Sequence, residues 1–259
     1  MNVADYIINF FAKKGIEKAF VVYGAANGYL IDAFTRNSKI QYVSTMHEQA
    51  AGFAAEGYAK IKRLPGLSIV TSGPGATNLV TGIAQAKAAF SPVVSIAGSF
   101  STKDNMEDAF QGLDQQSLFK PITKKTWTVK NVKNIPQVFS DAFKLAMSSR
   151  RGPVCINLPR NILSEKYSYK INENKKSYEN QSSIKAKSNS IKKAVKIISK
   201  SIKGVIVAGG GIKYNSKYKE VIKLSKLLNI PIVTAAGHGD AIPFNYKLNA
   251  GQMGPRGNP

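Results

Sequence analysis

The sequence alternates two kinds of segment, and this alternation constrains the fold more than any other feature. Short apolar runs rich in Val and Ile end at Gly- or Pro-marked turns, and longer segments with helical periodicity follow them. We expect strands at 19–24, 40–45, 67–72, 93–99 and 154–159 and helices at 3–15, 28–37, 47–62, 75–90 and 135–149. This order predicts an α/β fold, with a doubly wound, mainly parallel sheet and helices on both faces.

The same alternation restarts after a polar, lysine-rich stretch at 166–187, which we interpret as a linker. Helices are expected at 190–201 and 217–229 and strands at 204–211 and 230–237. Two strands make a poor sheet alone. We therefore expect a complete domain at 1–165 and, at 188–259, a partial Rossmann-like α/β domain. The chain is then expected to be a fragment, or to be completed by another chain.

Composition and the single cysteine limit the class of protein. Hydrophobic residues make up 43% and charged residues 20%, as in ordinary globular proteins. No apolar run approaches the roughly 18 residues that a membrane span needs. The N-terminus carries Asp5 and no small-residue cleavage site, which argues against a signal peptide. Cys155 lies in an apolar run and is expected to be buried and inert. We expect a cytoplasmic protein with no membrane partner.

The net charge of +22 raises the question of nucleic-acid binding. Its distribution argues against that function, because the segment Lys166 to Lys226 has 16 Lys and 3 Glu and thus holds 13 of the 22 charges. Elsewhere the basic residues are scattered, and they lack the interleaved aromatic side chains of a base-stacking surface. We expect no nucleic-acid partner.

Three segments at the predicted carboxyl ends of strands could carry chemistry: YGAANG, TMHEQ and TSGPGATN. The Gly-rich loop from Ser72 to Asn78 could cradle a phosphate or form a tight turn, since it lacks the GxGxxG and P-loop patterns. Glu48 could be a catalytic carboxylate or only complement a helix dipole. Glu56 is expected to form a surface pair with Lys60. No spacing of His and Cys predicts a metal site.

The order of several sequence segments, taken together, helps to choose between these interpretations of Glu48 and the Gly-rich loop. The segments HEQAAGFAAEGYAK, IVTSGPGATNLVTGIAQA, DAFQGLDQ, KPITKKT and GPVCINLP occur in this order over residues 1–165. In order and spacing they resemble the N-terminal pyrimidine-binding domain of thiamine-diphosphate enzymes, in particular the acetolactate synthase large subunit. The segments VAGGGI, PIVTAAGHG and GQMGPRG resemble the start of that family's middle domain.

The resemblance implies a thiamine-diphosphate-dependent carboligase or decarboxylase of 2-keto acids, which joins two pyruvates into 2-acetolactate with loss of CO2. It also leaves open a non-catalytic truncated paralogue that binds a full-length subunit, or another 2-keto acid decarboxylase or lyase. A homodimer, or pairing with a full-length subunit, is implied. The ligands of Mg2+ and the diphosphate are expected in a C-terminal domain that this sequence lacks, so the chain alone should be inactive.

The resemblance also assigns residues. Glu48 matches the catalytic Glu that hydrogen-bonds N1′ of the cofactor's aminopyrimidine and so promotes loss of the proton from thiazolium C2. The Gly-rich loop becomes a border of the pyrimidine instead of a phosphate cradle. Phe110 and Gln111 match residues of the 2-keto acid pocket. The residues expected to bind the cofactor are Gly24, Ala26, Asn27, Glu48, Ser72, Gly73 and Asn78.

Three details of the pattern carry further expectations. The family turn F-G-x-P-G-G is replaced by Tyr23 to Gly28, where Asn27 is expected to take the left-handed backbone of Gly. Small residues after Glu48 are expected to bring their helix close to the sheet and to a second subunit: Ala50, Ala51, Gly52, Ala54 and Ala55. FAD is a further cofactor that the resemblance raises, and the matching positions are Gly209, Gly210, Gly211 and Arg256.

Overall fold

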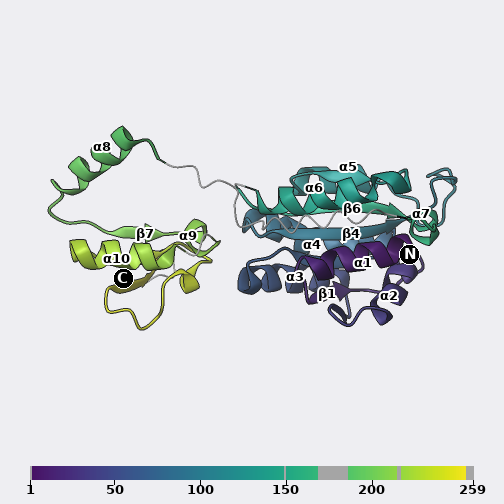
Figure 1. Ribbon diagram of the computed structural model, residues 1–259, viewed down its shortest axis with the longest axis horizontal. Coiled ribbons are helices and arrows are strands. Elements are labelled where there is room, and N and C mark those ends of the chain that lie inside the picture. The colour runs from purple at the N-terminus through teal and green to yellow at the C-terminus, as the bar shows by residue number, and fades with distance from the viewer. Residues whose placement is uncertain (1, 149, 169–185, 215–216, 255–259) are drawn as a thin grey trace. The chain divides into compact units, whose positions relative to one another are not determined.

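The computed structural model describes residues 2–148, 150–168, 186–214 and 217–254 (Figure 1). The chain divides into two compact units, residues 1–181 and 182–259. Most of the predicted linker, 169–185, lies outside the described residues. No described helix is both long and apolar enough to cross a membrane.

The first unit contains a six-stranded sheet in which every pair of neighbouring strands is parallel. The strand order is β2-β1-β3-β4-β6-β5. The strands are β1 Lys18–Val21, β2 Gln41–Ser44, β3 Gly66–Val70, β4 Val93–Ser99, β5 Thr126–Thr128 and β6 Val154–Pro159. The predicted α/β fold with a parallel sheet is confirmed. The edge strand β5 lies in a stretch that we expected to be irregular, because three residues are too short to show a strand pattern.

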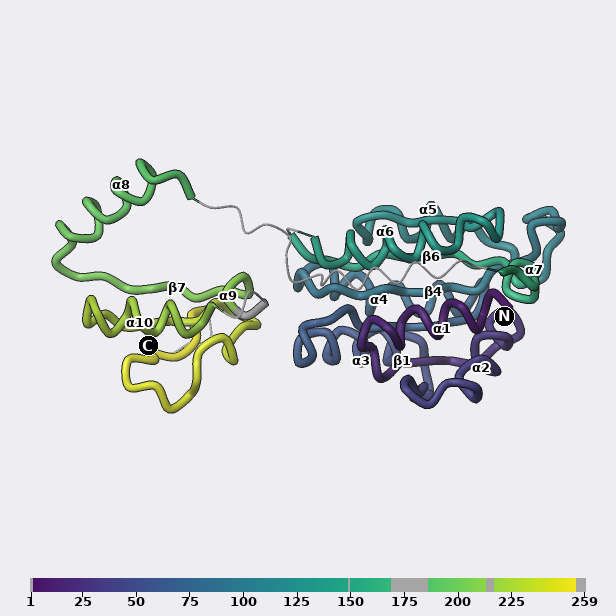
Figure 2. The backbone as a smooth tube through the Cα atoms, viewed as in Figure 1, coloured from purple at the N-terminus to yellow at the C-terminus, as the bar shows by residue number. Residues whose placement is uncertain are grey.

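Seven α-helices of the described first unit surround this sheet (Figure 1, Figure 2). They are α1 Val3–Lys13, α2 Gly28–Thr35, α3 Glu48–Lys62, α4 Pro74–Ala88, α5 Gln115–Phe119, α6 Ile135–Met147 and α7 Arg160–Ser164. Two 3-10 helices, η1 Lys120–Ile122 and η2 Val132–Asn134, complete the unit. The sequence pattern predicted all of the α-helices except α5 and α7, which have only five residues each.

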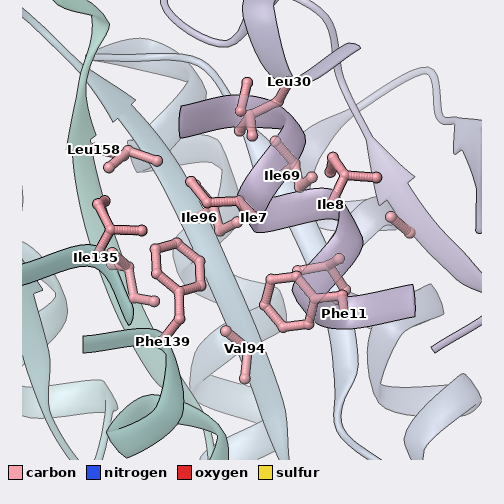
Figure 3. Packing of buried hydrophobic residues seen from close by; sticks show 14 of the residues in the cluster. Ile7, Ile8, Phe11, Leu30, Ile69, Val94, Ile96, Ile135, Phe139 and Leu158 are labelled. Atoms are coloured by element: carbon pink, nitrogen blue, oxygen red, sulfur yellow. The ribbon is translucent and has the colours of Figure 1, made fainter. Parts of the chain in front are cut away.

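The core lies in two layers, one on each face of the sheet. Successive residues of a strand point to opposite faces, and Ile69 and Val70 accordingly belong to different buried clusters. Large side chains of α1 and α6 fill the first cluster, where Phe11 and Phe139 meet edge to face over β4 (Figure 3). The second cluster has fewer residues, four of them Ala, and its helical members come from α3, α4 and α5. Helices therefore cover both faces, as predicted.

Small residues let α3 lie close to its neighbours within this chain. A Cβ atom added to Gly52 would lie 3.0 Å from the Cα atom of Gly82 in α4. One added to Gly66 in β3 would lie 1.9 Å from the carbonyl oxygen of Ala55. The expected close approach to the sheet is present, and the contact with α4 was not predicted. Because α3 begins at Glu48, this packing fixes the helix that carries the candidate carboxylate.

The second unit has a three-stranded parallel sheet in the order β7-β8-β9. Its elements are β7 Ile206–Ala208, β8 Ile232–Thr234, β9 Asn249–Gln252, α8 Ser188–Ile198, α9 Gly210–Tyr214, α10 Tyr218–Leu228 and the 3-10 helix η4 Gly239–Ala241. The expectation of two strands was wrong, because β9 has the sequence NAGQ and carries no β-branched or aromatic residue. The buried hydrophobic residues of this unit's cluster are Ala208, Ile232 and Ile242.

Candidate active site

The candidate residues of the first unit meet where the order of the sheet reverses. From β1 the chain continues to β2 on one side, whereas β3 lies on the other side of β1 and leads to β4. Ligands of open parallel sheets bind at such a switch point, beyond the carboxyl ends of the strands. Here the turn after β1 packs on the loop after β3, since a Cβ atom added to Gly24 would lie 2.4 Å from Cβ of Thr71.

Glu48 is the first residue of α3, three residues beyond the end of β2 at Ser44. His47 caps the helix in an extended backbone conformation, and its Nδ1 accepts a hydrogen bond from the Gln49 amide at 3.2 Å. The residue Glu48 is only 7% exposed. Its Oε2 accepts a hydrogen bond from Nδ2 of Asn78 at 3.0 Å. Glu48 is therefore a buried carboxylate with a fixed partner, which differs from a solvated residue that only complements a helix dipole.

The loop after β3 shapes the surroundings of this carboxylate. Gly75 lies in the first turn of α4, and a Cβ atom there would lie 3.2 Å from Oε1 of Glu48 and 2.7 Å from Cγ2 of Thr71. Asn78 is on the same helix, three residues later, and so lies on nearly the same face. One carboxylate oxygen is thus held by Asn78, while the other lies beside the space that Gly75 leaves open.

The turn after β1 is closed by a side chain. Asn27 is fully buried, its Oδ1 accepts a hydrogen bond from the Gly24 amide at 3.0 Å, and its Nδ2 donates to the Val22 carbonyl at 2.9 Å. The expected left-handed backbone was wrong, since φ of Asn27 is −119°. These two hydrogen bonds make a glycine-like conformation unnecessary. The neighbouring residue Ala26 is buried and donates its amide to Oγ1 of Thr71 at 3.4 Å.

Of the two expected substrate residues on the segment 100–114, between β4 and α5, Gln111 contacts the Gly-rich loop. Oγ of Ser72 donates a hydrogen bond to Oε1 of Gln111 at 2.8 Å. Gly73 has a φ of 57°, and an added Cβ would lie 2.7 Å from Cβ of Gln111. Gln111 itself has a φ of 60°, a conformation that is costly for a residue with a side chain. Phe110 is 82% exposed at the tip of this segment.

A second carboxylate of α3 is buried as well. Glu56 accepts a hydrogen bond from Oγ of Ser91 at 3.3 Å, and its Oε1 lies 2.7 Å from Nζ of Lys60. The predicted pair with Lys60 is present, but the expectation that it lies on the surface was wrong. Glu56 follows Glu48 by eight residues, so both point from α3 toward the interior. The sequence could not predict that Glu56 is buried, because the inner face of α3 consists mostly of small residues and has few large apolar side chains to mark it.

Sequence reasoning missed two residues that organise the site, Thr71 and Gln115. Thr71 contacts the turn after β1 and the first turn of α4. Gln115 is buried in the first turn of α5. The only local signal for α5 is Asp114 followed by Ser117, whose amide donates to the Asp114 carboxylate at 3.0 Å. Hydrogen bonds from Ser117 lower the pKa of Asp114 and keep this helix cap ionised.

Cys155 lies in β6, within the second buried cluster. It is fully buried, as predicted, and its Sγ is 3.9 Å from Oδ1 of Asn157. Burial raises the pKa of the Cys155 thiol, so the thiolate needed for nucleophilic or redox chemistry is disfavoured. This cysteine is part of the packing of the sheet.

The expected nucleotide glycines lie in the second unit. The strand β7 ends at Ala208, and Gly210 begins α9, where an added Cβ would lie 2.6 Å from Cε1 of His238. Gly209 and Gly211 have no atom within 4 Å of such a Cβ. Arg256 lies outside the described residues. Among the residues that the structure describes, no group of three or more His, Cys, Asp or Glu side chains could hold a metal ion.

Two models of known protein families match this chain. Residues 1–118 match the model of the thiamine pyrophosphate enzyme N-terminal TPP binding domain, and residues 191–259 match that of the central domain. The chain therefore belongs to the thiamine pyrophosphate enzyme family and carries its N-terminal and central domains.

Individual proteins similar to this chain carry the name acetolactate synthase large subunit. The chain is 37% identical to a probable acetolactate synthase large subunit of Methanocaldococcus jannaschii, over 99% of this chain and 44% of that protein. It is 35% identical to the acetolactate synthase large subunit of Buchnera aphidicola subsp. Schizaphis graminum, over 99% of this chain and 45% of that protein. It is 32% identical to the acetolactate synthase isozyme 1 large subunit of Escherichia coli, over 98% of this chain and 44% of that protein. The chain spans less than half the length of these relatives.

Proposed function

We propose that this chain supplies the pyrimidine-binding half of the active site of a thiamine-diphosphate-dependent 2-keto acid carboligase, of the acetolactate synthase type. One observation carries the proposal: a buried carboxylate, Glu48, is held by Asn78 at the switch point of a parallel sheet. The names of the relatives support the reaction, in which two pyruvates give 2-acetolactate and CO2.

The residues present fit the cofactor's aminopyrimidine. Nδ2 of Asn78 donates a hydrogen bond to Oε2 of Glu48. Oε1 is then the oxygen that would form a hydrogen bond with a ring nitrogen of the cofactor. Gly75 carries no side chain beside Oε1, and an added Cβ would come within 3.2 Å of it. Thiamine diphosphate, when bound, supplies a thiazolium carbon that adds to the carbonyl group of a 2-keto acid. Asn27, Gly24 and Ala26 would border the ring from the turn after β1.

Glu48 has the two properties that a proton relay at a ring nitrogen requires. Burial lowers the local dielectric constant, so a hydrogen bond between its carboxylate and a ring nitrogen is stronger than in water. The hydrogen bond from Asn78 fixes the orientation of the carboxylate, so the proton can be held at one atom.

Ser72, Phe110 and Gln111 would meet the 2-keto acid. The Ser72 hydroxyl is already bound to the Gln111 side chain, and this contact joins the substrate segment to the cofactor loop. Phe110 is largely exposed and would contribute an apolar surface on which the methyl group of pyruvate can pack.

Thiamine diphosphate binding requires more than this half-site. We propose that Mg2+ and the diphosphate are held by the part of the assembly that corresponds to the relatives' remaining length, whether in the same polypeptide or in a partner subunit. The described residues alone would then bind the cofactor weakly and turn over no substrate, because the anchoring charges of metal and diphosphate lack their partners. FAD at the glycines of the second unit stays a prediction of the sequence.

The test compares two buried glutamates of one helix in the holoenzyme that contains this chain. With pyruvate, thiamine diphosphate and Mg2+ supplied, NMR should detect 2-acetolactate as the product. Replacing Glu48→Gln should lower kcat by about 100-fold or more, the size typical of losing a general acid or base. Glu56→Gln, the matched control, should keep kcat within about twofold since it lies two turns away. Acetaldehyde as the sole product would instead favour a decarboxylase of the same family.

A further inference from the structure

Gln115 forms a buried junction between three elements of the first unit. It is 2% exposed. Its Nε2 donates to the carbonyl of Gly98 at the end of β4 at 3.1 Å and to Oδ1 of Asn157 in β6 at 3.4 Å. Its Oε1 accepts a hydrogen bond from the amide of Gly73 at 3.4 Å. One side chain thus ties the start of α5 to two strands and to the Gly-rich loop.

This junction stands at one end of the segment 100–114, which carries Phe110 and Gln111. The other end is tied to the start of α7, because the amide of Thr102 donates to Oδ1 of Asn161 at 3.0 Å and Nδ2 of Asn161 donates to Oγ1 of Thr102 at 3.0 Å. Between these ties the segment is mostly exposed. Within the segment, Gln111 is bound to Ser72 and Asp104 to Arg160. Its conformation near the candidate site therefore also depends on what holds its carboxyl end.

Gln111 shows why that end has to be held. Its left-handed backbone costs free energy, and such conformations persist only when the surrounding structure imposes them. Gln111 packs on the bare Cα of Gly73, and Gly73 is the residue whose amide Gln115 binds. Gln115 thus restrains the surface against which Gln111 rests and also the chain that follows Gln111.

We propose that Gln115 is a positioning residue that sets where Phe110 and Gln111 lie relative to Ser72 and Gly73, and thereby determines which 2-keto acid the site accepts. This inference rests on the proposed function of the site. Gln115 acts through Gly73 and Gln111 and need not touch substrate or cofactor.

The contacts of Gln115 are separate from those of Glu48. Glu48 is held by Asn78 and borders Gly75, whereas Gln115 binds Gly73, Gly98 and Asn157. Asn157 is in turn fixed by donating to Oγ1 of Thr128 at 3.3 Å. Loss of the Gln115 amide should therefore change the substrate side of the site and leave the carboxylate in place.

The first experiment measures backbone hydrogen exchange on this chain itself. Gln115→Met keeps the length of the side chain and removes all three hydrogen bonds, so the amides of Gly73 and Gly112 should exchange about tenfold faster. The amide of Ile96, in the middle of β4, should keep its rate. Gln85→Met is the matched control, because Gln85 is an exposed glutamine near the carboxyl end of α4, away from the contacts of Gln115, and it should leave all three rates unchanged.

Gln115→Asn is a second variant, which keeps the amide group on a side chain one methylene shorter. It shows whether the effect of Gln115→Met comes only from a folding defect caused by Met. It should give the same pattern. The proposal is overturned if Gly73 and Gly112 keep their wild-type rates in both variants, or if Ile96 accelerates in step with them, which would mark a purely structural role.

The second experiment uses the holoenzyme and separates this proposal from the proposed function. Gln115→Asn should raise KM for the 2-keto acid about tenfold and keep kcat, and exchange of the thiazolium C2 proton, within about twofold. A fall in kcat and in C2 exchange with KM unchanged overturns the inference. If wild-type enzyme and Glu48→Gln exchange the C2 proton equally fast, the proposed function of Glu48 fails, and the hydrogen-exchange result for Gln115 still reports on the segment.

Discussion

The two units of this chain differ in how completely their elements are packed. In the first unit helices cover both faces of the sheet, and four Phe side chains are fully buried: Phe11, Phe119, Phe139 and Phe143. In the second unit α8 has no buried residue, and the buried cluster consists of one Ala and two Ile side chains. A site that must hold atoms within tenths of an ångström needs a fixed backbone. The described contacts of the candidate site accordingly lie in the first unit.

The largest expected effect comes from a single added methyl group. Gly66→Ala would place its Cβ 1.9 Å from the Ala55 carbonyl, a backbone atom that cannot move without shifting α3. We expect a loss of about 3 kcal/mol or more of the free energy of unfolding. Gly211→Ala in the second unit meets no atom within 4 Å and lies in α9, so it should cost no stability and add up to about 1 kcal/mol.

The single tryptophan makes the loss of stability in Gly66→Ala measurable. Trp127 lies in β5, so its fluorescence during urea unfolding reports on the first unit alone. If Gly66→Ala unfolds at the wild-type urea midpoint, then α3 is not held against β3 as the structure has it.

The next effect compares large side chains of the two units. Phe139 is fully buried, and Phe139→Ala should cost about 3–5 kcal/mol by leaving a cavity. Leu227 in α10 is exposed, and Leu227→Ala should stay within about 0.5 kcal/mol. Calorimetry of both variants checks the difference. A comparable loss for Leu227→Ala would show that this face of α10 is covered in solution.

A smaller effect is expected where a buried charge loses its partner. Asn78→Leu removes the donor to Oε2 of Glu48 and should cost about 1–3 kcal/mol, because the buried carboxylate is left with one hydrogen bond fewer. Lys217→Leu breaks an exposed pair with Glu220 in the second unit and should cost less than about 0.5 kcal/mol. Equal urea midpoints for Asn78→Leu and wild type would contradict the account of Glu48.

The smallest effect concerns helix caps. His47 caps α3 through its side chain, whereas Lys187, at the start of α8, makes no side-chain cap hydrogen bond. His47→Ala should cost about 1 kcal/mol, and Lys187→Asp should add a similar amount of helix stability to α8. Circular dichroism and thermal unfolding measure both. A stabilised His47→Ala variant would show that the cap does not operate in solution.

The sequence predicted those parts of the fold that depend on local pattern. β4 and β6 were predicted at their observed bounds, because each is buried along its whole length and reads as a continuous apolar run. β5 and β9 were missed since short, partly exposed strands form through pairing with distant residues. The resemblance named Glu48, Asn78, Ser72, Gln111 and Gly24 from the sequence. The structure adds their contacts: Asn78 with Glu48, Ser72 with Gln111, and Gly24 with Thr71.

Long-range contacts account for what the sequence did not show. Gln115 meets Gly73 and Asn157 across 42 residues of chain in each direction. Glu56 is buried, and Ser91, 35 residues later, donates a hydrogen bond to its carboxylate. Asn27 adopts an ordinary backbone because its side chain, and not its φ angle, closes the turn. None of these partnerships has a fixed spacing that a pattern could reveal.

If Glu48 acts on the aminopyrimidine of thiamine diphosphate, it should control the rate at which the cofactor exchanges its C2 proton. In the holoenzyme, NMR of the bound cofactor in deuterated water should show exchange slowed by about 100-fold or more in Glu48→Gln. Glu56→Gln, with its buried carboxylate on the same helix, should exchange at the wild-type rate. Exchange at the wild-type rate in Glu48→Gln would contradict the account.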